Sequence, residues 1–147
     1  MIEHITHDGQ TIAFIIRDSF HAPGITFITP DNFSQQLAYM SHPCGKVLQS
    51  HFHNPHSREV VRTQEVLVIK RGKLRVDFYD TDRQYLESAV VGAGDVLLLA
   101  SGGHGFEVIE DVTMIEIKQG PYAGDADKTR IPCVAAENIV IKKSPRE

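Results

Sequence analysis

The chain has 147 residues, of which 41% are hydrophobic and 23% charged, as expected for one globular domain with its own core. Its formal net charge is −4 and its basic residues are scattered, which argues against nucleic acid or an anionic membrane as the main partner. The longest apolar runs are too short to cross a bilayer, and the first residues lack the basic and apolar regions of a secretory signal. We therefore expect a cytoplasmic protein in which Cys44 and Cys133 are reduced thiols.

Short runs rich in β-forming residues recur along the chain, separated by turn formers, and no window has a sustained apolar period of 3.6 residues. The runs cover residues 11–17, 25–29, 35–40, 46–53, 65–71, 73–79, 85–91, 95–100, 105–109, 112–118 and 138–142. The break at Arg71-Gly72 predicts a hairpin between two of them. The pattern predicts an all-β fold, with about ten short antiparallel strands in a sandwich or barrel.

Four residues on these predicted strands could meet around a divalent metal. Alternation along a strand places His51 and His53 on the same face, with Phe52 opposite. An ionised Glu65 inside a barrel is costly unless its charge is paired or bound to a cation. A metal held by His51, His53, Glu65 and His104 would remove that cost. The residues alone leave a second interpretation, in which these are hydrogen-bonded polar groups at the barrel rim.

The spacing of these residues resembles the cupin superfamily. Gly45-x5-His51-x-His53, followed by Glu65-x6-Gly72, is similar to the first cupin motif, and Gly94 to His104 is similar to the second. The resemblance covers roughly residues 45–117, with metal motifs within 45–72 and 94–104 of a single domain spanning 1–147. It implies a double-stranded β-helix, or jelly-roll barrel, that binds one divalent metal ion (Fe, Mn, Ni or Zn). Residues 54–64 form an insertion before Glu65, so His56 and Glu59 remain alternatives to it.

Other residues could line a pocket beside this site. Gln49 and Phe106 share the strand parity of His53 and His104, and either lie on a pocket wall or fill the barrel interior. Arg58 and Arg62, in the insertion, could bind a carboxylate or phosphate through two parallel hydrogen bonds, or be solvated. A second long connection, residues 120–130, is either a lid or a surface excursion.

Three functions fit these observations. As the resemblance implies, the first is a metal-dependent enzyme that oxygenates, isomerises or decarboxylates a small molecule, which can be anionic. The second is a metal-free isomerase or epimerase of sugars or nucleotide-linked sugars, with His51 or His53 as acid or base. The third is a non-catalytic module that binds or senses a ligand. Uncovered strand edges lead us to expect a homodimer.

Overall fold

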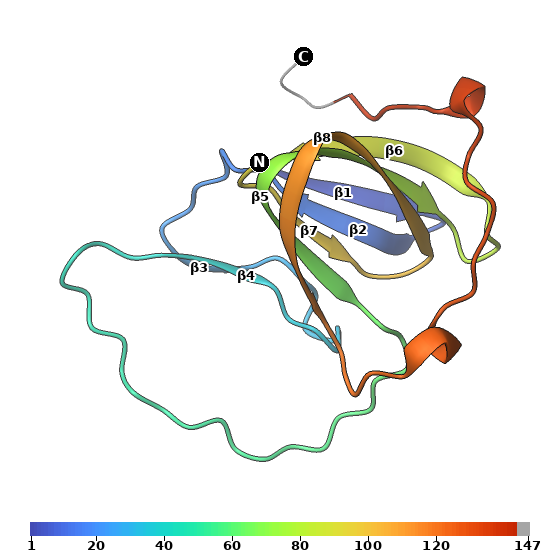
Figure 1. The fold of residues 1–147 in the computed structure, drawn as a ribbon. Helices are drawn as coiled ribbons and strands as arrows, with labels where there is room; N and C mark the ends of the chain where they lie inside the picture. Colours follow the sequence, from blue (N-terminus) through green and yellow to red (C-terminus); the bar gives the residue numbers. More distant parts are fainter. Residues whose placement is uncertain (144–147) are drawn as a thin grey trace.

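The computed structural model describes residues 1–143, and within them the fold is all-β, as the sequence predicts. A curled antiparallel sheet forms the body of the molecule (Figure 1). The strands are β1 (Ile2–His7), β2 (Gln10–Ile16), β3 (Gly24–Phe27), β4 (Ala38–Ser41), β5 (Glu65–Tyr79), β6 (Tyr85–Gly92), β7 (Val96–Leu99) and β8 (Gly103–Lys118). Two short 3-10 helices follow, η1 (Gly124–Asp127) and η2 (Ala136–Asn138).

Strand β5 is the centre of the sheet, whose order is β1-β2-β7-β5-β6. Along one edge it pairs with β8 over its whole length. Along the other edge its first part pairs with β7 and its last part with β6. One strand therefore joins two portions of sheet that face in different directions.

The β5–β8 ribbon bends sharply at Gly72. Its register shifts between Ile69 and Leu74, and Gly72 has a φ of +78°. A Cβ atom on Gly72 would lie 2.0 Å from the carbonyl oxygen of Asp111 on β8, so only glycine fits there. The predicted hairpin at Arg71-Gly72 is therefore wrong: the glycine bends a strand that continues, because its partner β8 continues beside it.

The observed strands differ from the predicted ones in other places as well. Residues 105–109 and 112–118 belong to the single strand β8, so the strands of the described chain are fewer and longer than predicted. The structure adds a strand at β1 that the sequence pattern did not reveal. Residues 138–142 form no strand; Asn138 is the last residue of η2, and Ile141 forms an isolated bridge with Ser88.

The core lies on the concave face of the sheet. Its buried side chains come from all strands of the main sheet except β8, and they are Ile5, Ile12, Ala13, Ile15, Leu67, Ile69, Leu74, Val76, Phe78, Ala89, Val91, Leu97 and Leu99. A smaller cluster on the opposite face joins Phe14, Val66 and Leu98, and the connection between β3 and β4 packs against it. Before the bend, alternate residues of β5 therefore face the two clusters: Leu67 and Ile69 face the core, and Val66 and Val68 face the smaller cluster.

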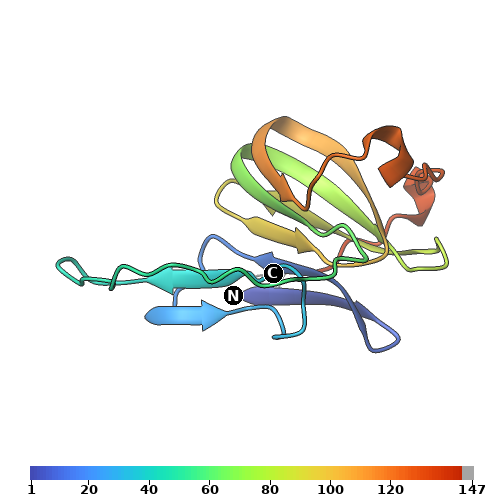
Figure 2. The ribbon, with the colours of Figure 1, turned by 90° about the horizontal axis from the view of Figure 1, so that it is seen from below.

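Residues 43–63, which we call the arm, connect β4 to β5 without regular structure. Every one of these residues is exposed, and the arm forms a wide loop standing away from the sheet (Figure 1). The predicted strand at 46–53 is therefore wrong for this chain, because no neighbouring strand supplies the hydrogen bonds that a strand requires. The arm and the β3–β4 hairpin project together beyond the curled sheet (Figure 2).

Two further observations concern the predicted environment of the chain. Both cysteines are free thiols on the surface, as expected for Cys44 and Cys133 in reduced form. Within residues 1–143, no helix is long and apolar enough to cross a membrane.

Candidate functional site

Glu65 and His104 form a contact that depends on the bend of the β5–β8 ribbon. Glu65 begins β5, whereas His104 lies opposite Phe78, near the other end of that strand. A straight strand rising 3.3 Å per residue would separate Glu65 from Phe78 by about 43 Å. In the bent ribbon, His104 Nε2 lies 3.3 Å from Glu65 Oε2. Both side chains lie on the core face, since Glu65 alternates with Val66 and His104 pairs with buried Phe78.

Glu65 is almost fully buried, with 6% of the residue's surface exposed. The hydrogen bond from His104 lowers the pKa of Glu65, and this outweighs burial, which raises it. The positive charges of Lys128 and Lys118 lower that pKa further. Lys118 Nζ, from the residue opposite Glu65 on β8, lies 4.0 Å from Glu65 Oε1. The carboxylate is therefore ionised at neutral pH.

A pocket of about 490 Å³ opens beside this pair. Its walls combine Glu65, His104 and Phe106 with the Gly102-Gly103 turn, Thr63 and residues 127–131. The Phe106 ring centroid lies 5.2 Å from that of His104, so an aromatic surface adjoins the imidazole. Lys128 and Arg130 bring positive charge to the rim, and Asp127 brings one negative charge. The pocket therefore suits a small molecule that carries an anionic group.

His51 and His53 lie apart from this pocket, in the exposed arm. Their ring centroids are 5.1 Å apart, and His51 Nδ1 lies 3.0 Å from the carbonyl oxygen of Gln49. Nowhere in residues 1–143 do three or more His, Cys, Asp or Glu side chains gather as a metal site would require. Zinc enzymes use three protein ligands, so Glu65 and His104 alone do not fit such an ion.

The remaining predicted site residues divide between the pocket and the arm. Phe106 lines the pocket, whereas Gln49 and Arg58 lie in the arm, where Arg58 Nη1 donates to the His56 carbonyl at 3.4 Å. Arg62 lines two hollows next to the pocket but not the pocket itself. Glu65, His56 and Glu59 were the three alternatives for one ligand of the predicted metal site. Glu65 is the one that lies beside His104, whereas His56 and Glu59 are exposed arm residues.

The sequence interpretation missed the basic side chains as parts of the site. Lys118 contacts Glu65 only because the two residues are opposite each other in the ladder, a register that the sequence does not reveal. Lys128 and Arg130 belong to the connection over residues 120–130, and nothing in the sequence placed them beside His104. Their close spacing, two basic residues around Thr129, is the one signal that could have indicated an anion site.

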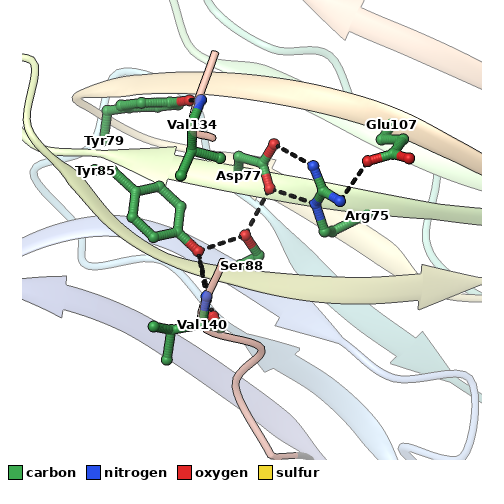
Figure 3. A network of polar contacts seen from close by, with 8 residues as sticks. All are labelled: Arg75, Asp77, Tyr79, Tyr85, Ser88, Glu107, Val134 and Val140. Atoms are coloured by element: carbon green, nitrogen blue, oxygen red, sulfur yellow. Dashed lines mark hydrogen bonds and ion pairs between the residues drawn. The ribbon is translucent and has the colours of Figure 1, made fainter. Parts of the chain in front are cut away.

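A second buried carboxylate, Asp77, lies on the outer face of β5 in a closed polar network (Figure 3). Arg75 binds it through two hydrogen bonds, of 2.7 and 3.1 Å, and Ser88 Oγ donates to it at 2.5 Å. Arg75 also pairs with Glu107 on β8. The Tyr85 hydroxyl lies 2.7 Å from Ser88 Oγ. These groups satisfy one another away from the pocket, and their role is structural.

The C-terminal segment closes this network from outside. The Val140 amide donates to the Tyr85 hydroxyl at 3.0 Å, and the Val134 amide donates to the Tyr79 hydroxyl at 2.9 Å (Figure 3). The Ser88 amide and carbonyl also bond to residues 140 and 142. Residues 134–142 therefore cover the outer edge of β6.

Asp95, in the motif region 94–104, has a structural role too. Its Oδ2 accepts hydrogen bonds from Arg17 Nη1 at 2.9 Å and from the Gly92 amide at 3.1 Å. Arg17 Nε in turn donates to Glu3 at 2.7 Å. The carboxylate thus ties the turn before β7 to the ends of β1 and β2. Of the charged or titratable residues in this motif region, His104 alone reaches the pocket.

Comparison of the chain with protein-family models, with curated proteins and with solved structures finds no significant match in any of the three.

Proposed function

We propose that the pocket beside Glu65 and His104 is the active site of a small-molecule enzyme that moves a proton on an anionic substrate, as isomerases and epimerases do. The single observation that carries the proposal is the carboxylate–imidazole pair, 3.3 Å apart, on the wall of the pocket. A buried carboxylate that orients an imidazole is a recurring arrangement for general acid–base chemistry.

In this proposal His104 is the group that takes and returns the proton. When its Nε2–H donates to Glu65, the other ring nitrogen, Nδ1, carries the lone pair and acts as the base. Glu65 holds the ring in this tautomer and stabilises the imidazolium that forms after proton transfer. From the sequence, His51 or His53 was the expected acid or base of a metal-free enzyme. In this proposal His104 has that role instead.

The basic residues at the rim would bind the anionic part of the substrate. Arg130 and Lys128 lie on the pocket wall, and a guanidinium group matches the geometry of phosphate oxygens. A phosphate or diphosphate at this position would place the rest of the molecule against Phe106 and His104. Sugar phosphates and nucleotide-linked sugars combine such a phosphate or diphosphate with a sugar that could lie against these two residues.

A metal-dependent enzyme of cupin type is the second candidate. The observation that favours it is the pairing of one oxygen and one nitrogen donor, Glu65 and His104, from the two resembling motifs. His51 and His53 would have to join them from the arm to complete a ligand set. Such a metal would supply Lewis-acid or redox chemistry, and a jelly-roll barrel closed by the arm would surround it.

The experiment is a binding and exchange assay on the full chain. Pyrophosphate should shift the NMR signals of the His104 ring, and Arg130→Ala should weaken its binding about tenfold while Lys70→Ala, an exposed change on β5 outside the pocket, leaves it unchanged. In D₂O, a panel of sugar phosphates and nucleoside diphosphate sugars should then contain a member that gains deuterium, with loss of exchange in His104→Ala.

The outcomes separate the candidates. Pyrophosphate binding without deuterium incorporation from any panel member would contradict the acid–base enzyme and leave a binding or sensing module. Elemental analysis of untagged protein tests the second candidate: a stoichiometric divalent metal that is lost in both Glu65→Gln and His104→Ala would favour it over the metal-free enzyme.

A further inference from the structure

A further hollow, which we call the outer hollow, lies between the end of the β5–β6 hairpin and the C-terminal segment. Its volume is about 420 Å³, within the range of sites that hold small molecules. Two tyrosines and two arginines are among the side chains that line it: Tyr79, Tyr85, Arg83 and Arg130. Neither Glu65 nor His104 lines it, so it is distinct from the pocket of the proposed function.

The walls of the outer hollow are held by the hydrogen bonds that anchor the C-terminal segment. The Tyr79 and Tyr85 hydroxyls accept these bonds from backbone amides, at 2.9 and 3.0 Å (Figure 3). The two ring centroids are 5.8 Å apart, and the ring planes cross at 71°. Together with Ile131 and Pro132, the rings give the hollow a partly aromatic, apolar wall. A flat apolar group can pack against such a wall.

Arg83 and Arg130 give the outer hollow a positive charge. No aspartate or glutamate is among the described residues that line it. Within residues 1–143, no ion pair or side-chain hydrogen bond is identified for either guanidinium. Two positive groups on one hollow repel each other, and an anion bound between them would replace that repulsion by attraction. The whole chain has a net charge of −4, so this excess of positive charge is local.

Arg83 occupies a backbone position that ordinarily favours glycine or asparagine. Its φ is +67°, in the left-handed region. The turn before β6 imposes this conformation, since Asp80 Oδ1 accepts hydrogen bonds from the amides of Asp82 and Gln84, both at 2.8 Å. Glycine would serve the turn better than arginine does, so the arginine side chain indicates a role outside the turn.

We propose that the outer hollow binds a small aromatic carboxylate, with its carboxylate group between Arg83 and Arg130 and its ring against Tyr85 and Pro132. Guanidinium groups match the planar geometry of a carboxylate. Arg130 also lines the pocket beside His104, so an anion that engages it in the outer hollow should weaken anion binding in that pocket, and the reverse. This second effect rests on the proposed function, whereas the outer site itself does not.

Titration of the full chain with benzoate and phenylacetate tests the site. At least one acid should bind and shift the amide NMR signals of Arg83 and Val134. Benzamide, which has the ring without the charge, and acetate, which has the charge without the ring, should each bind about tenfold more weakly or worse. No binding by either acid, benzamide binding as tight as that of the acid, or signal shifts confined to other regions would overturn the site.

Arg83→Gly removes the guanidinium and keeps the left-handed backbone. The variant should resist urea at least as well as the wild type, because glycine adopts this φ without strain, and should bind the acid about tenfold more weakly. Arg71→Ala is the matched control, since it removes an exposed arginine of β5 that does not line the hollow, and it should leave binding unchanged. Wild-type binding in Arg83→Gly, or an equal loss in both variants, would overturn the site.

Competition between the two pockets tests the link through Arg130. A saturating concentration of the bound acid should weaken pyrophosphate binding to the wild-type chain about fivefold or more. The acid should have no such effect on Arg83→Gly, which retains every residue that lines the pocket beside His104. An unchanged pyrophosphate affinity in the wild type would overturn the link. A chain that binds the acid but not pyrophosphate would contradict the proposed function alone, so the two failures are distinguishable.

Discussion

Two buried carboxylates on the same strand, Asp77 and Glu65, have different surroundings. Asp77 is 4% exposed and receives hydrogen bonds from Arg75 and Ser88 that occupy both of its oxygens. Glu65 is nearly as buried, but its partners are one imidazole at 3.3 Å and one ammonium at 4.0 Å, beside a pocket. Burial of charge therefore does not by itself distinguish a functional group. The difference lies in whether the charge is enclosed by fixed protein partners or faces a space that a ligand can enter.

The largest expected effect is the loss of the closed network. Asp77→Ala should destabilise the fold by about 4 kcal/mol, because it leaves the Arg75 guanidinium and the Ser88 hydroxyl without their buried partner. Urea unfolding measures this change. Glu107→Ala is the matched control, since it removes the exposed partner of the same arginine and should cost less than about 1 kcal/mol. Equal losses of unfolding free energy in the two variants would contradict the greater importance of the buried partner, Asp77.

A change at the bend of the β5–β8 ribbon should disturb the contact between Glu65 and His104. Gly72→Ala combines a positive φ with a Cβ 2.0 Å from the Asp111 carbonyl oxygen, and should cost about 3 kcal/mol. Gly9→Ala has a similar φ of +74° and open space around its Cβ, so it should cost only about 1 kcal/mol. Urea unfolding compares them, and NMR of the His104 ring should show a change in Gly72→Ala alone. A similar loss of stability in both variants would indicate that the close approach of Asp111 is relieved easily.

The smallest effect concerns the pH dependence of stability. Burial raises the pKa of Asp77, but the hydrogen bonds from Arg75 and Ser88 outweigh it, and the pKa is lowered. Asp77 therefore stabilises the fold above its unfolded pKa of about 3.9, and this contribution is lost as the pH falls through the lower folded value. The difference in unfolding free energy between the wild-type chain and Asp77→Asn should narrow below about pH 4. Stability curves from pH 7 to 2 measure it, and a difference that stays constant or widens would contradict the assignment.

Much of the fold class was predictable, because β-forming runs and turn formers are local signals. The runs at 85–91 and 95–100 correspond to β6 and β7 within one or two residues. The long strands were not predictable in the same way. A glycine at positive φ serves equally in a hairpin and in a bend, and the outcome at Gly72 depends on whether β8 continues alongside.

The site was predictable in its residues more than in its arrangement. Glu65 and His104 were chosen from motif spacing, and they contact each other through a bend that no local pattern encodes. His51 and His53 were placed on one strand face, but parity has meaning only where a neighbouring strand holds the backbone extended. In the described chain that neighbour is missing at 46–53, which is why the arm differs from the prediction.

The C-terminal segment has a consequence for recognition. Residues 127–131 form one wall of the pocket, and the chain that follows is anchored at Val134 by Tyr79 and at Val140 by Tyr85. Thr63 holds Asp127 from the other side at 3.1 Å. The backbone that carries Lys128 and Arg130 is thus held between fixed points, so the proposed binding of an anion would cost less backbone conformational entropy than binding to a free loop.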